Sequence, residues 1–112
     1  MKGVVKMILY FKNMKALELL RSFKQLSHID KLRLTIHLFE NSNLDVSVNN
    51  EMQMLRNQLN ELDKNYTSTL VNFSKYRNLT LMCAIFMEMS EKDRKIVILD
   101  MINNIFKTSK NN

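Results

Sequence analysis

Apolar residues recur every three or four positions along most of the chain, which is the spacing of one face of an α-helix. The first such stretch covers residues 14–26, where Asn13 can cap the helix start. The next begins at Ser27–Asp30, which has the form of a capping box, and runs to about Asn41. A polar turn over 41–45 follows. The inner positions predicted for these two helices are Leu17, Leu20, Phe23, Ile29, Leu32, Ile36 and Phe39.

The longest periodic stretch starts near Ser47 and ends at Phe73. Its apolar and bulky residues step alternately by three and four, which is a heptad seam sustained over three repeats. We predict one continuous helix here, whose seam must be covered by another helix of this chain or of a second copy. The heptad steps also pass through Thr69, and the seam positions proposed for helix packing or partner contact are Met52, Leu55, Leu59, Leu62, Tyr66 and Phe73.

The last third is apolar through Met89 and then offers a second capping-box form at Ser90–Asp93. This start predicts a final helix whose inner face carries Ile96, Leu99, Ile102 and Phe106. Residues 107–112 are predicted to be a flexible tail. Residues 1–12, which suit a strand or a short amphipathic helix, are predicted to be a loosely attached segment.

Composition supports a helical fold, because the chain has one Gly and no Pro to build the tight turns of a sheet. The prediction for 1–112 is therefore a single all-α domain, a small helical bundle with one long central helix. The single cysteine, Cys83, leaves no internal disulfide, and no apolar run is long enough to span a membrane. We expect a cytoplasmic protein, and leave open whether the native start is Met1 or Met14.

Residues with catalytic or ligand-binding chemistry are scattered in the sequence. His28 and His37 lie nine positions apart, without a carboxylate or thiol at metal-ligand spacing from both. A lone Gly3 cannot form a phosphate-binding loop, and Cys83 is expected to be a small buried hydrophobe. The sequence therefore predicts a non-enzymatic protein with no metal, no cofactor and no small-molecule substrate.

The segment Ser90–Leu99, Ser-Glu-Lys-Asp-Arg-Lys-Ile-Val-Ile-Leu, resembles the wing of MarR-type winged-helix transcriptional regulators, in which an Asp-x-Arg element stands at a hairpin tip. Asp93 matches the Asp, and Lys95 stands where that family has Arg. The resemblance implies an alternative fold, a mainly α winged helix-turn-helix with a short β-hairpin. It further implies that residues 65–69 face the DNA groove. The residues proposed for anion or nucleic-acid contact are Lys75, Arg77, Lys92, Arg94 and Lys95.

Charge and pattern lead to two competing function hypotheses. The net charge is +6, and residues 1–33 hold eight Lys/Arg against two acids, which favours a dimeric nucleic-acid-binding regulator. The heptad seam and the apolar runs 79–89 and 96–106 favour a helical protein–protein interaction module, an adaptor or an inhibitor of a larger protein. Attachment of residues 1–24 to a membrane surface is a third hypothesis. We lean to the regulator, which would use both the charge and the seam.

Overall fold

Residues 14–63 and 77–110 are described by a computed structural model, in which they form five α-helices and no strand. These helices confirm the predicted all-α bundle. They are α2 (Met14–Lys24), α3 (His28–Ser42), α4 (Asn49–Leu62), α5 (Arg77–Met87) and α6 (Glu91–Lys110).

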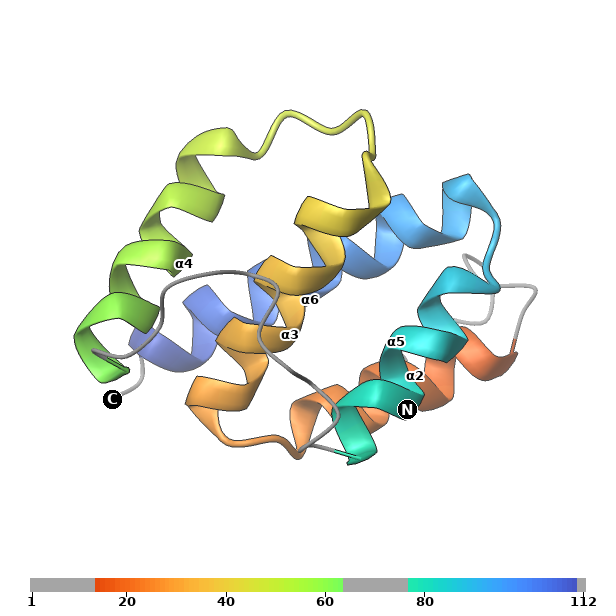
Figure 1. The fold of residues 1–112 in the computed structure, drawn as a ribbon, viewed down its shortest axis with the longest axis horizontal. Coiled ribbons are helices and arrows are strands. Elements are labelled where there is room, and N and C mark those ends of the chain that lie inside the picture. The colour runs from red at the N-terminus through yellow and green to blue at the C-terminus, as the bar shows by residue number, and fades with distance from the viewer. Residues whose placement is uncertain (1–13, 64–76, 111–112) are drawn as a thin grey trace.

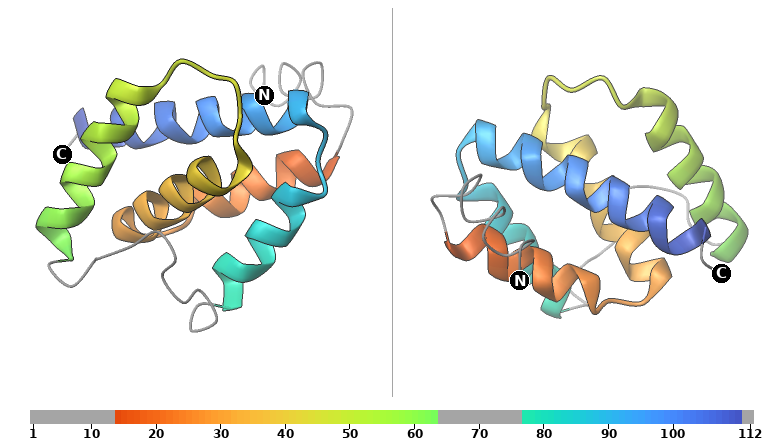
Figure 2. Two further views of the ribbon diagram at one scale, coloured as in Figure 1. Left: turned by 45° about the horizontal axis from the view of Figure 1, so that its top comes forward. Right: turned by 180° about the vertical axis from the view of Figure 1, so that it is seen from behind.

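Helix α3 occupies the centre of the described bundle (Figure 1). It contacts α4, α5 and α6, whereas α2 packs against α5 and α6. Figure 2 shows α4 on the opposite side of α3 from α2 and α5. Because α3 touches three neighbours, most of its apolar residues are buried, and its Arg33 and Glu40 form ion pairs with Asp63 and Arg56.

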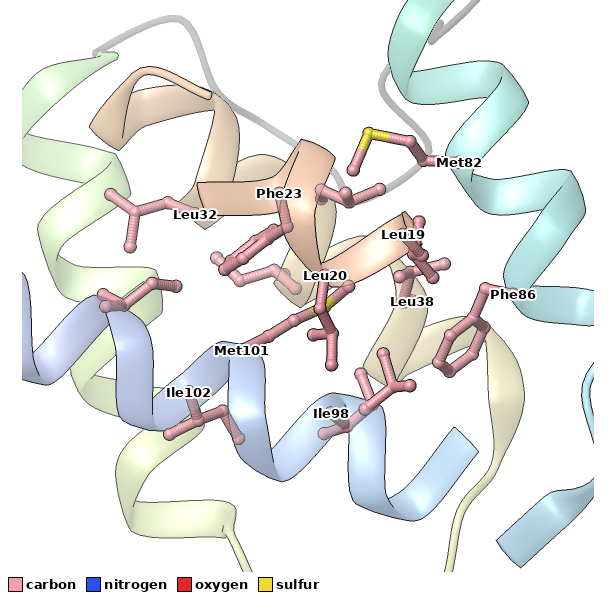
Figure 3. Close-up of a cluster of buried hydrophobic side chains, with 14 of the residues drawn as sticks. Leu19, Leu20, Phe23, Leu32, Leu38, Met82, Phe86, Ile98, Met101 and Ile102 are labelled. Carbon is pink, nitrogen blue, oxygen red and sulfur yellow. The ribbon is translucent and has the colours of Figure 1, made fainter. Parts of the chain in front are cut away.

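The core is one continuous cluster of aliphatic, Met and Phe side chains (Figure 3). Phe23 of α2 and Phe86 of α5 are its largest fully buried members. Burying such side chains drives folding at about 1.5–3 kcal/mol each. The labelled residues come from four helices: Leu19, Leu20 and Phe23 (α2), Leu32 and Leu38 (α3), Met82 and Phe86 (α5), and Ile98, Met101 and Ile102 (α6).

The starts of α3 and α6 follow the signals read from the sequence. The Ser27 Oγ accepts a hydrogen bond from the Asp30 backbone N–H at 3.3 Å, and the Ser90 Oγ accepts one from the Asp93 N–H at 3.2 Å. Asn43 ends α3 with φ 50° and ψ 46°, a left-handed conformation that Asn tolerates better than most residues. Both predicted capping boxes therefore start helices.

The predicted continuous helix from Ser47 to Phe73 is wrong, because α4 ends at Leu62 and Asp63 is extended. Apolar spacing supports a helix only where its stripe is packed, and the packed stripe of α4 stops at Leu59, since Leu62 is 55% exposed. Positions Tyr66, Thr69 and Phe73, and the proposed groove-facing residues 65–69, lie outside the described residues.

The β-hairpin implied by the winged-helix resemblance is absent from the described residues. Segment 91–99 is the start of α6, and Ser90 caps it as a helix. The run of Ile and Val alone fits either a strand or a buried helix, whereas the Ser90 cap is a feature of a helix start.

The inner face of α6 differs from the prediction in one respect. Ile102 is buried as expected, but Leu99 is 41% exposed, and Val97, Ile98, Met101 and Ile105 are buried instead. The helix carries more apolar residues than one face can hold, so spacing alone did not fix which of them face inward. Helix α6 also continues to Lys110, past the predicted tail start at Lys107. The predicted N-terminal segment 1–12 lies outside the described residues.

Candidate functional site

Part of the predicted seam lies in the hydrophobic core. Met52, Leu55 and Leu59 are fully buried against the bundle. Leu62, the last residue of α4, is 55% exposed. The described seam thus has no free apolar edge between Met52 and Leu59 for a partner to cover.

Of the residues proposed for anion contact, the structure describes the side chains of Lys92, Arg94 and Lys95, which lie in the first turns of α6. Lys75 lies outside the described residues, and Arg77 is the first residue of α5. The Arg94 Nε donates a hydrogen bond to the Met89 carbonyl at 3.0 Å, and the Lys95 Nζ is 3.9 Å from a Glu91 carboxylate oxygen. Lys92 is exposed. Two of these cations therefore support the start of α6 itself.

Helix α5 presents an apolar face to solvent. Its inner face, with Leu79, Met82 and Phe86, packs into the core. On the opposite side lie Leu81, which is 55% exposed, exposed Ala84, and Met87, which is 48% exposed. These three are spaced by three residues and so share one face of the helix. No charged residue occurs between Asn78 and Met87, which is unusual for a solvent-facing helix surface.

The C-terminal end of α5 meets the N-terminal end of α2. The Glu88 carboxylate lies 3.7 Å from the Lys15 Nζ, and both side chains are largely exposed. Met14, at the first position of α2, is 58% exposed and adjoins this pair in sequence. We call Leu81, Ala84, Met87 and Met14 the α5 apolar surface.

Cys83 lies at the border of this surface and is half-buried. Burial raises the pKa of its thiol from 9.0 to about 11. The thiol is therefore protonated at neutral pH. Cys83 packs as a small apolar side chain, as expected, although it is half-buried and not fully buried. Nucleophilic chemistry would need the opposite shift.

The two histidines have structural hydrogen-bond partners. The His28 Nε2 lies 3.0 Å from the Gln58 Oε1, and the His37 Nδ1 lies 3.3 Å from the Asn41 Nδ2. No group of three or more His, Cys, Asp or Glu side chains in the described residues is arranged to hold a metal ion.

A network of charges joins α3 to the end of α4. Arg33 places one guanidinium nitrogen 3.2 Å from an Asp30 carboxylate oxygen and the other 3.0 Å from an Asp63 carboxylate oxygen. Its side chain is only 14% exposed. A second pair, Arg56 with Glu40 at 2.8 Å, links the same two helices. These two ion pairs tie α4 and the residue that follows it to α3.

Sequence reasoning identified the apolar run 79–89, but it could not say which of its residues face outward. That division depends on where α2 and α3 pack. A polar-rimmed pocket between α2 and α6 was missed altogether, because its residues Lys24 and Asp100 are far apart in the sequence.

Comparison with known proteins gives no relative: no family model, no curated protein and no solved structure matches the chain. Among the described helices, none combines the length and apolar character needed to cross a membrane.

Proposed function

We propose that this is a small, non-enzymatic regulatory protein that acts by binding, and that its contact surface is the α5 apolar surface, which pairs with the same surface of a second copy. The observation that carries the proposal is the alignment of Leu81, Ala84 and Met87 on one outward, uncharged helix face. Single exposed hydrophobes are ordinary, but several on one face favour a contact site. A cytoplasmic location belongs to the same proposal.

A second copy is the occupant that the charge pattern favours. In a two-fold contact the same helix meets itself, so any charge on its outward centre would face a like charge. The stretch Asn78–Met87 has none. Its Met and Leu side chains are adaptable enough to interdigitate across such an axis.

The test is the molar mass in solution, measured by size-exclusion chromatography with light scattering from low to high micromolar concentration. We expect a dimer that dissociates on dilution. Leu81→Glu should give a monomer, since it opposes two carboxylates across the axis. Met54→Glu is the matched control: Met54 is 52% exposed on α4, far from α5, and its variant should dimerise as the wild type does.

A monomer at every concentration would remove this proposal, and so would equal behaviour of the two variants. Far-UV circular dichroism of both variants checks that each is folded. An interaction with a different protein would then need its own evidence.

Nucleic-acid binding is a second candidate, supported by the net charge of +6 and by exposed Lys92, which has no ion pair with any described residue. If this candidate is right, the protein should bind generic duplex DNA at low salt. The affinity should fall steeply as the salt concentration rises, because binding releases counterions from the DNA. A gel-shift series over salt concentration measures this. No retention at the lowest salt would exclude it.

A further inference from the structure

The chain enters the described bundle at the edge of the α5 apolar surface. Met14, the first residue of α2, belongs to that surface. The Nζ of the next residue, Lys15, lies 3.7 Å from a carboxylate oxygen of Glu88, directly after α5. Helices α2 and α5 pack against each other, on the opposite side of α3 from α4 (Figure 2). Residues 1–13, which lie outside the described residues, are therefore attached beside an exposed apolar helix face.

The composition of this N-terminal stretch suits such a face. Residues 4–11 read Val-Val-Lys-Met-Ile-Leu-Tyr-Phe, so seven of the eight are apolar or aromatic. Covering these side chains and those of the α5 apolar surface together removes both from water. The lysines at 2, 6 and 12 meet no charge between Asn78 and Met87. A second copy, by contrast, brings its own net charge of +6 to the contact, which opposes pairing.

The stretch is also long enough to cover the surface. Eight residues span about 12 Å as a helix and about 27 Å as an extended chain. Leu81 and Met87 are six helical positions apart, which corresponds to about 9 Å along α5. Lys12 and Asn13 remain to connect the covering residues to Met14. Either conformation therefore allows residues 4–11 to reach from one end of the surface to the other.

We propose that residues 4–11 cover the α5 apolar surface of their own chain and so compete with the second copy for it. The inference rests on the proposed function, because it concerns the regulation of the same contact. Each chain has to release its own N-terminal residues before it can pair. The N-terminal stretch thus acts as a built-in inhibitor of dimer formation.

The size of the effect follows from the tether. A short linker holds a segment near its site at an effective concentration in the millimolar range. A contact with an intrinsic dissociation constant in the same range is then formed about half of the time. Because both partners must release their segments, half coverage weakens the dimer about fourfold, and tenfold coverage weakens it about a hundredfold.

The first experiment measures the dimer dissociation constant of the full chain by light scattering over a concentration series. The double variant Ile8→Ser, Leu9→Ser removes two adjacent apolar side chains, so it acts on the covering residues in a strand or a helix. We expect its dimer to be at least about fourfold tighter than that of the wild type. Met54→Ser removes an exposed apolar side chain from α4 instead, and should dimerise as the wild type does. Far-UV circular dichroism confirms that both variants are folded.

The second experiment detects the contact directly and does not depend on dimer formation. A nitroxide spin label is attached through Lys6→Cys in a Cys83→Ser background, and the isotope-labelled chain is diluted into an excess of unlabelled chain without a spin label. Paramagnetic broadening in NMR spectra then reports contacts within one chain. We expect broadening of the amides of Leu81 and Met87. The same label on exposed Asn50→Cys, at the start of α4, should leave both signals sharp.

The proposal is overturned if the Lys6→Cys label leaves Leu81 and Met87 unbroadened. It is also overturned if the double variant dimerises as the wild type does, or more weakly. If neither chain dimerises at any concentration, the proposed function fails by itself. In that case broadening by the Lys6→Cys label still supports coverage of the surface by the N-terminal residues, and its absence overturns it.

Discussion

Replacing Arg33 by Met tests whether the charge network between α3 and α4 stabilises the fold. Arg33 joins two carboxylates at 3.2 and 3.0 Å with a side chain that is 14% exposed, while Asp30 and Asp63 are 28% and 24% exposed. Methionine keeps most of the aliphatic stem in place. The substitution therefore removes the two charged contacts and leaves both carboxylates poorly solvated.

The magnitude lies between two limits. Breaking a fully buried ion pair costs about 3–5 kcal/mol, and an exposed pair contributes about 0–1 kcal/mol. Because all three groups keep some access to water, we expect Arg33→Met to lower the free energy of unfolding by about 2 kcal/mol. Lys95→Met, which removes a pair at 3.9 Å whose Glu91 partner is 66% exposed, should cost less than about 0.5 kcal/mol.

Urea unfolding followed by far-UV circular dichroism measures both variants against the wild type. The midpoint should fall for Arg33→Met with an unchanged slope, since the core is untouched. Equal stability losses in the two variants would refute the reasoning, as would a loss below about 0.5 kcal/mol for Arg33→Met, which would reduce the network to an ordinary surface pair.

Four further predictions concern single residues. Thr35→Val should stabilise the protein by about 1 kcal/mol in urea unfolding, because the buried Thr35 hydroxyl has no hydrogen-bond partner in the described residues. Ser90→Ala should destabilise it by about 1 kcal/mol in the same assay, since the α6 cap is lost. Cys83 should react with iodoacetamide at pH 8 about tenfold more slowly than a free thiol: its pKa of about 11 lowers the thiolate fraction about a hundredfold, and higher nucleophilicity offsets about tenfold of this. Burial raises the pKa of the Asp100 carboxyl above 3.8, so ionisation of this carboxyl opposes folding. The neutral carboxyl favours the folded state at low pH, and this contribution to stability is lost as the pH rises through the raised pKa. Asp100→Asn should therefore be more stable than the wild type at pH 7, with the advantage vanishing near pH 3 in thermal melts.

The sequence was sufficient for the helices whose signals are local. Ser27 and Ser90 start α3 and α6 as predicted, because a capping hydroxyl acts on backbone N–H groups three residues away. The end of α4 could not be predicted, because heptad spacing continues past Leu62, whereas the packing of the apolar stripe stops at Leu59. The wing-like interpretation of residues 90–99 was wrong for a related reason: a short apolar run fits strand and helix alike.

The surface features were less accessible to sequence reasoning than the fold. The α5 apolar surface lies within a run that was noted as a partner candidate, yet exposure of Leu81 and Met87 depends on which side of the helix α2 and α3 occupy. The pocket between α2 and α6 combines Lys24 with Asp100, and no spacing rule connects residues so far apart. Within the proposed basic set, Arg94 and Lys95 interact with their own neighbours, contacts that only the structure reveals.

Helix α4 packs chiefly against a single neighbour, α3, whereas each of the other described helices packs against at least two. A segment held by one interface can detach while the remainder keeps its packing. Amide protons of α4 should therefore exchange with solvent through a partial opening of the molecule, faster than those of α3 or α6. Such an opening would expose Met52, Leu55 and Leu59 together. This transient hydrophobic surface could be recognised by chaperones or proteases before the whole chain unfolds.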